Sequence, residues 1–388
     1  MSRFGEYLEI RTSKGLSYVR FSSMEKINTA EGIVFDCDGV LIDARPSYDE
    51  ALKNTVKELV RILIGIEINP NSIPSETIYT IRNTGGFNND YNTVHLLTTW
   101  ICLHAPEENL EKLKKRISNN FDLTTLLNTK PNTEIKLTEY EVTTLMKKLE
   151  EGIRKYENTG AGYEEIEKNL FRELLNSYEK RSRYLKVLLD ALRYPSFYGE
   201  GLLVTIFDEM YFGSDNIREV RRRGPFFNFR GMIENEKLMV DSSTLREFKR
   251  MFGRMGLATG RGSWETYKTL GDLISYFDRG ACVFIADKIS QLTGGDLVMY
   301  EKPSPYALLE SVRNLGVDGN TVIYVGDSVA DLLMWKKARE QVGDLLFVGV
   351  YGGINETDRL FCFIEGGADV VIPDVTELIK LVNFLRGD

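Results

Sequence analysis

The stretch GIVFDCDGVLID, from Gly32 to Asp43, decides the fold of this chain and raises its main chemical question. A short apolar run ends at Asp36, and a second aspartate, Asp38, follows one residue later. A continuous apolar run of this length is typical of a strand that is buried on both faces of a parallel sheet. Two carboxylates at its end repel each other unless a cation binds them or a reaction uses them.

Similar runs recur in the later part of the chain, and helical patterns such as 304–316 and 329–341 separate them. This alternation predicts an α/β fold, a doubly wound parallel sheet with helices on both faces. Residues 1–30 are expected to add a small β-element. The expected strands are EGIVFD (31–36), MGLAT (255–259), ACVFIA (281–286), TVIYVGD (321–327), LLFVGV (345–350) and ADVVIP (368–373).

The middle of the chain has a different pattern. It is rich in Lys, Glu, Leu and Tyr, and stretches such as 165–192 carry apolar residues at helical spacing. We therefore predict an α/β core made of residues 1–43 and 241–388. A helical domain, residues 44–240, is inserted after the first core strand.

Composition excludes several classes of function. The chain has 388 residues and a formal net charge of −8, which argues against nucleic acid or an anionic membrane as the main partner. Its cysteines form no CxxC pair, as expected of reduced thiols in a cytoplasmic protein. The N-terminus lacks the apolar core of a signal peptide, and LVRILIGIEI (59–68) is too short to span a bilayer. The sequence does not indicate the oligomeric state.

Polar residues follow the expected strands where each strand ends. Thr259 and Gly260 follow one strand, and Asp327, Ser328 and Asp331 follow another. Lys302 precedes a helix in the segment EKPSP. Because ligand sites of open parallel sheets form beyond the carboxyl ends of the strands, these side chains are expected to meet.

Such a set suits phosphoryl transfer to a carboxylate. Asp36 would attack phosphorus, and Asp38 would protonate the leaving alkoxide and then deprotonate the attacking water. Lys302 would supply positive charge. Mg²⁺ would be held by Asp36, the backbone carbonyl of Asp38, and the acids at 327 and 331. The Thr259 hydroxyl and nearby amides, including that of Gly260, would bind phosphate oxygens, although Thr259 could instead cap the next helix.

These residues resemble the four motifs of the haloacid dehalogenase superfamily, in its phosphatase branch. The motifs are FDCDGVLID, Thr259, the lysine of EKPSP, and GDSVAD (326–331), in the expected order. The resemblance implies Asp36 as nucleophile, Asp38 as acid/base, and Asp327 and Asp331 as Mg²⁺ ligands. An insert after the first motif resembles subfamily I, in which a helical cap closes over the site, although caps in that family are usually much smaller.

Two segments of the insert are candidates for substrate contact. The loop TGGFNNDYN (84–92) contains Asn88 and Asn89, which we predict to contact the substrate; a plain surface turn is the alternative. The basic segment 218–231 contains arginines 221–223, which could recognise an anion or form a solvated helix face.

The sequence therefore predicts a Mg²⁺-dependent phosphatase that acts on a small-molecule phosphate monoester. By resemblance alone, the substrate is phosphoglycolate-like or a sugar phosphate. Asp38 argues against the dehalogenases and phosphonate-cleaving relatives, which lack an acid there. A phosphomutase of the β-phosphoglucomutase type and a non-catalytic phospholigand-binding protein remain alternatives.

Overall fold

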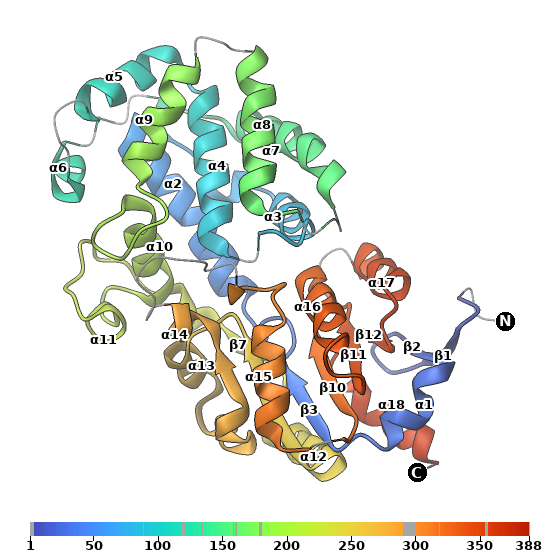
Figure 1. Ribbon diagram of the computed structural model, residues 1–388. Coiled ribbons are helices and arrows are strands. Elements are labelled where there is room, and N and C mark those ends of the chain that lie inside the picture. The colour runs from blue at the N-terminus through green and yellow to red at the C-terminus, as the bar shows by residue number, and fades with distance from the viewer. Residues whose placement is uncertain are drawn as a thin grey trace. The chain divides into compact units, whose positions relative to one another are not determined.

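The computed structural model of the chain is drawn in Figure 1. It describes residues 4–87, 89–117, 122–129, 131–132, 135–157, 159, 161–177, 181–289, 299–317, 319–353 and 356–387.

The chain forms two compact units, which are described separately. Met1–Ala44 and Glu236–Asp388 form an α/β unit, and Arg45–Asn235 form a helical unit. Glu236–Val240 were expected in the inserted domain, but they belong to the α/β unit. The physical reason is a short ribbon in which β7 (Lys237–Leu238) pairs antiparallel with β4 (Ile42–Asp43).

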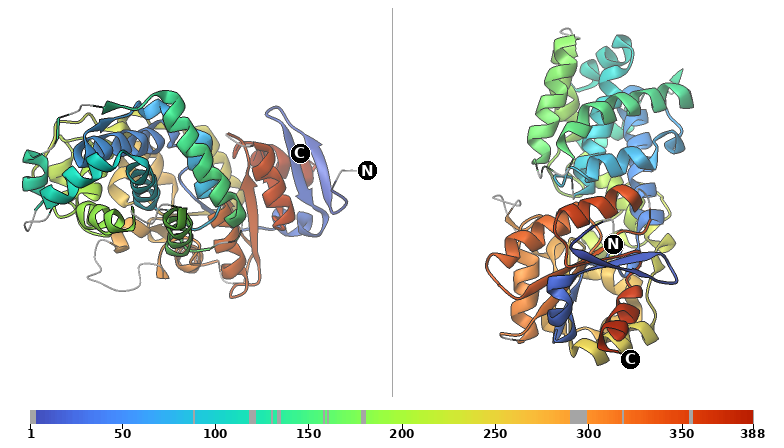
Figure 2. Two further views of the ribbon diagram at one scale, coloured as in Figure 1. Left: turned by 90° about the horizontal axis from the view of Figure 1, so that it is seen from above. Right: turned by 90° about the vertical axis from the view of Figure 1, so that its right-hand side faces the viewer.

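The core of the α/β unit is an eight-stranded sheet. Its inner strands, from β12 to β9, run parallel, and an antiparallel β1–β2 hairpin extends one edge through β12. The hairpin lies at the edge of this unit, which also holds both chain ends (Figure 2). In spatial order the strands are β1 (Tyr7–Arg11), β2 (Leu16–Arg20), β12 (Val370–Ile372), β11 (Leu345–Val350), β10 (Val322–Gly326), β3 (Gly32–Phe35), β8 (Arg254–Thr259) and β9 (Cys282–Phe284).

Helices cover both faces of this sheet. Because successive side chains of a strand point to opposite faces, Val34 and Tyr324 pack on one side with Leu308 of α15 and Trp335 of α16. On the other side, the Phe35 ring lies 5.2 Å from that of Phe248 in α12. The predicted doubly wound fold is therefore confirmed. The helices of the unit are α1 (Met24–Asn28), α12 (Ser242–Phe252), α13 (Ser263–Leu270), α14 (Ile285–Ile289), α15 (Tyr306–Leu315), α16 (Val329–Arg339), α17 (Glu356–Glu365) and α18 (Glu377–Arg386).

The strand order reverses between β3 and β10. From β3 the chain adds β8 and β9 on one side and then returns to add β10, β11 and β12 on the other. Open α/β sheets bind ligands at such a reversal, beyond the carboxyl ends of the strands. Asp36 directly follows β3 and Asp327 directly follows β10, so both acids lie at this point. The expected strands agree with those observed to within one residue at each end, except at 281–286 and 368–373, where the strands are Cys282–Phe284 and Val370–Ile372. The first of these is shorter because α14 begins at Ile285.

The helical unit is built around two helices that are almost wholly buried. Every residue of α10 (Leu202–Phe212) is buried, and α4 (Asp90–His104) packs against α2, α7, α9 and α10. Figure 1 shows α4 in the middle of this unit. Its other elements are α2 (Glu50–Ile64), α3 (Ser75–Arg82), α5 (Glu107–Ile117), α6 (Leu123–Asn128), α7 (Glu139–Ile153), α8 (Tyr163–Ser177), α9 (Ser182–Leu192), α11 (Ile217–Arg221) and the paired strands β5 (Ile66–Glu67) and β6 (Ile135–Lys136).

Candidate active site

Lys302 forms ion pairs with two of the expected acids at this reversal of strand order. Its Nζ lies 2.8 Å from Asp36 Oδ1 and 2.7 Å from Asp331 Oδ1. The lysine and Asp36 side chains are buried, and Asp331 is fully buried. Burial opposes the charge on Lys302, but the two carboxylates together hold its pKa above the ordinary value. The lysine is therefore a fixed cation within the acid cluster.

Asp331 is the most constrained of these acids. It belongs to the first turn of α16, where its Oδ2 accepts hydrogen bonds from Ser328 Oγ at 2.6 Å and from Ser328 N at 3.0 Å. The Ser328 hydroxyl in turn accepts from Asp331 N, which completes a capping box. Tyr324 donates to Oδ1 at 2.5 Å. Although burial acts against ionisation, Lys302 and these donors hold the pKa of Asp331 below its ordinary value.

Asp327 approaches the loop that carries Asp36 and Asp38. This approach requires Gly39, which has a φ of +71° and whose added Cβ would lie 2.0 Å from Asp327 Oδ2. Arg359 Nη1 lies 3.3 Å from the same oxygen. One carboxylate oxygen from each of Asp36, Asp327 and Asp331 can be chosen so that all lie within 4.8 Å of one another.

The charge of this cluster fits a divalent cation. Among the described residues, the ion pairs around the site join five carboxylates to three cationic side chains, a formal excess of two negative charges. Burial raises the pKa of Asp36 to about 8 against the opposing effect of Lys302, and it raises the pKa of Asp327 to about 6 against that of Arg359. A cation among these oxygens would favour their ionised forms. Hard carboxylate oxygens are the ligands that Mg²⁺ prefers.

Asp38 is directed to a different partner. Its Oδ1 accepts a hydrogen bond from Arg261 Nη1 at 2.7 Å, and its side chain is 38% exposed, more than those of the other three acids. Burial of the carboxyl group within the site raises the pKa of Asp38, while Arg261 opposes the rise. Its side chain is not part of the three-acid cluster, so only its backbone carbonyl is left for the expected contact with a metal.

Thr259 is the last residue of β8, and Gly260 directly follows it. Thr259 is fully buried, and its hydroxyl accepts a hydrogen bond from Arg261 N at 3.2 Å. It does not cap the following helix, because Gly262 is the N-cap of α13. Gly260 is exposed, and a Cβ there would meet no atom within 4 Å. The backbone at Gly260 therefore faces open space that a ligand could enter.

The loop candidates of the helical unit have local structural contacts. Asn89 is the N-cap of α4, because its Oδ1 accepts a hydrogen bond from Tyr91 N at 3.0 Å. Phe87 is fully buried, and its ring packs edge-on against Tyr163. Asn88 lies outside the described residues. Contact of Asn88 and Asn89 with a substrate stays a prediction.

The arginines at 221–223 do not act as one patch. Arg221 Nε donates to the fully buried Asp208 at 2.6 Å, and Arg223 Nη1 donates to the Tyr198 carbonyl at 3.1 Å. Arg222 is exposed. Two of the three side chains thus make hydrogen bonds within the helical unit. Fewer arginines are therefore available to bind an anion than the sequence suggests.

Sequence reasoning missed three charged residues of the site, Arg261, Arg359 and Glu236. Arg261 lies two positions after Thr259 in the motif TGRG, and this closeness was a usable signal. Glu236 meets Arg261 through the fold and has no motif around it.

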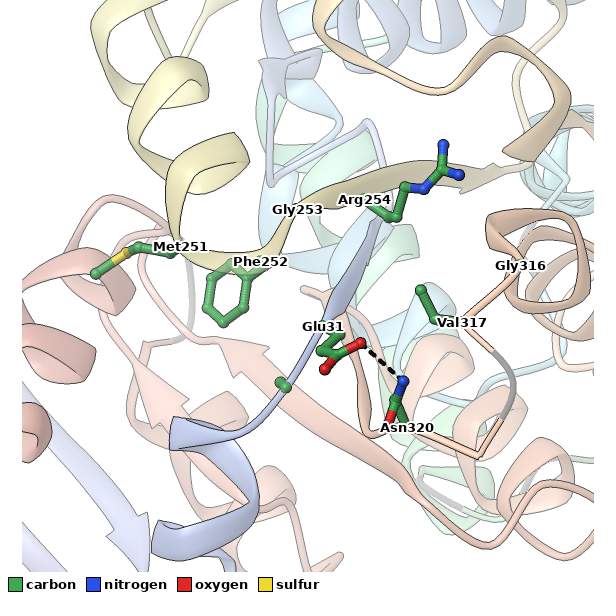
Figure 3. A pocket seen from close by; sticks show the side chains of 9 residues that line it. Glu31, Met251, Phe252, Gly253, Arg254, Gly316, Val317 and Asn320 are labelled. Carbon is green, nitrogen blue, oxygen red and sulfur yellow. Dashed lines mark hydrogen bonds between the residues drawn. The ribbon is translucent and has the colours of Figure 1, made fainter.

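A separate cavity of about 680 Å³ lies at the opposite edge of the sheet, near the amino ends of β3 and β8 (Figure 3). There Asn320 Nδ2 donates to Glu31 at 2.7 Å, and Arg254 lies 3.3 Å from Asp278. Since these polar groups already have partners, we do not assign the chemistry to this cavity.

Within the residues that the structure describes, no helix combines the length and the apolar character needed to cross a membrane.

Comparison with known proteins agrees with this geometry. "Probable phosphatase IndB" of Dickeya dadantii (strain 3937) is 40% identical over 67 residues, which are 17% of this chain and 27% of that protein. The chain thus spans about a quarter of the length of that relative.

A solved structure with low sequence identity shares the fold. An X-ray structure of a structural-genomics target, ZR25, matches with a TM-score of 0.61 and 19% identity, over 92% of this chain and all of that one. Phosphatase Tt82 from Thermococcus thioreducens matches with a TM-score of 0.44 and 22% identity, over 92% and 100% of the two chains.

The decisive match is to a protein family. The model of the haloacid dehalogenase-like hydrolases matches residues 30–339, which include all the acids, the lysine and the threonine described above. The chain therefore belongs to the haloacid dehalogenase-like hydrolases.

Proposed function

We propose that this hydrolase is a Mg²⁺-dependent phosphatase that hydrolyses a small-molecule phosphate monoester through an aspartyl-phosphate on Asp36. The observation that carries the proposal is the group of Asp36, Asp327 and Asp331 around Lys302 at the topological switch point. The name of the matched relative, a probable phosphatase, supports the same reaction class.

The acids would divide the metal-binding work between them. Asp36 and Asp327 would bind Mg²⁺ directly, together with the backbone carbonyl of Asp38. Asp331 would support them from the next layer, because its oxygens already accept hydrogen bonds from Lys302, Tyr324 and Ser328. When bound, the ion would neutralise the carboxylates and polarise the phosphate.

The reaction would proceed in two displacements. In the first, an Asp36 carboxylate oxygen forms a bond to phosphorus as the phosphorus–oxygen bond of the ester breaks. Asp38 gives its proton to the departing alkoxide, which leaves as an alcohol. In the second, Asp38 takes a proton from a water molecule as that water attacks phosphorus. The bond to Asp36 then breaks, which releases inorganic phosphate and restores the carboxylate.

Other residues would bind and orient the phosphate. The Lys302 ammonium group would balance the charge of the phosphoryl group beside Asp36. The hydroxyl of Thr259 and the amide of Gly260 would donate to phosphate oxygens. The helical unit would act as a cap that excludes water and contacts the rest of the substrate, a phosphoglycolate-like molecule or a sugar phosphate.

Two alternatives predict different products. A phosphomutase of the β-phosphoglucomutase type would return an isomer of the substrate and little inorganic phosphate. A phospholigand-binding protein would bind phosphate esters without turnover.

The test is a panel of phosphate monoesters, including p-nitrophenyl phosphate, 2-phosphoglycolate and hexose phosphates, assayed with Mg²⁺ or with EDTA. We expect stoichiometric release of inorganic phosphate that depends on Mg²⁺. Isomer formation would favour the mutase, and the absence of turnover on every ester would favour the binding protein.

The matched control for the metal is Asp327→Asn, which keeps the shape of the side chain and removes its charge. It should raise the Mg²⁺ concentration needed for half-maximal activity at least tenfold, and Ca²⁺ should support turnover poorly because it prefers more ligands at longer distances. Full activity in excess EDTA would exclude a metal at this site.

A further inference from the structure

Arg261 is a buried arginine whose contacts are divided between two carboxylates. Its side chain is 1% exposed, so its charge needs partners within the protein. Nη1 donates to Asp38 Oδ1 at 2.7 Å and to Glu236 Oε1 at 3.1 Å, and Nη2 donates to Glu236 Oε2 at 2.8 Å.

Glu236 fixes the orientation of the guanidinium group. The pair is bidentate, and a planar fork held by two parallel hydrogen bonds has little freedom to rotate. The Glu236 side chain is itself 1% exposed, and Thr269 donates its hydroxyl proton to Oε2. Arg261 Nη2 also donates to the Glu265 carbonyl at 3.3 Å. The position of Nη1 is therefore set by groups other than Asp38.

Asp38, in contrast, is held at Oδ1 by Arg261 and not by Lys302. Its carboxylate is more than a third exposed and lies in a loop, whereas Asp36 and Asp331 are both held by Lys302. A short acidic side chain with this exposure can adopt several rotamers, and few of them direct its proton to a leaving group. A hydrogen bond from a locked donor selects one of them.

We infer that Arg261, locked by Glu236, is a positioning residue that holds the acid/base Asp38 in its working rotamer. The inference rests on the proposed function, because it assigns Asp38 to proton transfer. Glu236 is also the first residue of the segment that re-enters the α/β unit, directly before β7. The same pair thus ties the β4–β7 ribbon to the acid/base residue.

The reaction with p-nitrophenyl phosphate separates this role from a structural one. p-Nitrophenolate is a stable anion and leaves without a proton, so formation of the aspartyl-phosphate needs Asp38 little. Its hydrolysis still needs Asp38 as base. Misplacement of Asp38 should therefore spare the first step and slow the second.

The experiment measures p-nitrophenolate by stopped flow in Arg261→Lys and in the double variant Glu236→Gln/Arg261→Gln. The double variant removes both charges of the buried Arg261–Glu236 pair, so it keeps the test valid if the single variant folds poorly. Asp38→Asn is the reference, and thermal unfolding checks each protein. Arg254→Gln is the matched control, because this arginine lies at the other end of β8, beside the cavity of Figure 3.

We expect both variants to release about one p-nitrophenolate per chain in a burst whose rate stays within about threefold of wild type. Steady-state kcat should then fall about 100-fold, the lower range for a lost general base. KM should fall in proportion, so that kcat/KM, which reports the spared first step, stays within about threefold of wild type. Asp38→Asn should show the same pattern, and Arg254→Gln should match wild type.

Other outcomes would overturn the inference. A raised KM with unchanged kcat would make Arg261 a substrate contact, and equal loss in both phases would make the pair structural. If the Arg261 variants keep the wild-type kcat while Asp38→Asn shows a burst, Arg261 does not position Asp38. The proposed function would then still stand. If wild type itself gives no turnover, the proposed function fails instead.

Discussion

Two groups of buried acidic residues, one in each unit, differ in how their negative charge is balanced. In the helical unit, Glu209 of α10 is fully buried and accepts hydrogen bonds from Tyr198, Ser214 and the backbone N–H groups of Phe226 and Phe227. In the α/β unit, Asp36, Asp327 and Asp331 converge, and the ion pairs around them leave an excess of negative charge.

The difference indicates what each cluster does. The Glu209 carboxylate accepts four hydrogen bonds, so it stabilises the 224–229 loop and is not expected to bind a ligand as well. The neighbouring Asp208 is similarly satisfied by Arg221 and Tyr91. In the α/β cluster, Lys302 and Arg359 balance only part of the negative charge, and protons or an added cation would balance the rest, which is typical of a functional site. Whether a buried carboxylate is structural or functional is thus indicated by the groups that it contacts and not by its burial alone.

The largest expected effect is at Asp36. Asp36→Asn preserves the shape of the side chain but removes the nucleophile, so phosphate release should fall at least about 10³-fold. The free energy of unfolding, from urea titration, should stay level or rise, because one repelling charge is lost. A variant that keeps a tenth of wild-type activity would contradict the covalent mechanism.

The second effect is a pH dependence of the metal-free protein. The folded pKa values of Asp36 and Asp327, about 8 and about 6, lie above the unfolded value of 3.8. The folded state therefore binds protons that the unfolded state has lost, and the free energy of unfolding should fall as pH rises from about 4 to 8. The slope approaches about 1.4 kcal/mol per pH unit for each proton held.

Urea titrations in EDTA at several pH values measure this slope, and parallel titrations in Mg²⁺ provide the comparison. Mg²⁺ should abolish the decline, because the bound carboxylates are ionised in the folded state. Identical slopes with and without Mg²⁺ would mean that the cluster is not a cation site.

The third effect tests whether the Glu209 cluster has a structural role and not a catalytic one. Glu209→Gln replaces one accepting oxygen with a donor, so at least one buried donor loses its partner. The free energy of unfolding should fall by about 2 kcal/mol, the range for a buried charged hydrogen bond. Turnover of p-nitrophenyl phosphate well below the melting temperature should stay within about twofold. A catalytic loss without a stability loss would reverse our interpretation of this cluster.

The smallest effect is at Asn89. Asn89→Ala removes the N-cap of α4 and should cost about 1 kcal/mol of stability. If capping is its only role, 2-phosphoglycolate and p-nitrophenyl phosphate should be turned over as by wild type. If the ester panel identifies a preferred substrate, a loss of turnover of that substrate alone would instead support contact between Asn89 and the substrate.

The sequence alone was enough to predict the α/β architecture, which is confirmed, and most residues of the candidate site, whose roles stay predictions. Asp36 and Asp327 directly follow buried strands, and Thr259 ends one. Parallel strands bring their carboxyl ends to one edge, so a residue's place after its strand predicts where it lies. The same reasoning had less to use in the helical unit, where neither Asn89 nor Arg221 follows a strand.

Only the tertiary structure decided which side chains restrain which. Arg261 meets Asp38 and Glu236 from distant parts of the sequence, and no local pattern encodes that a guanidinium group will join them. Strand periodicity is a local property of the chain, whereas hydrogen-bond partners depend on packing between segments, which fixes rotamers only when the whole core has formed.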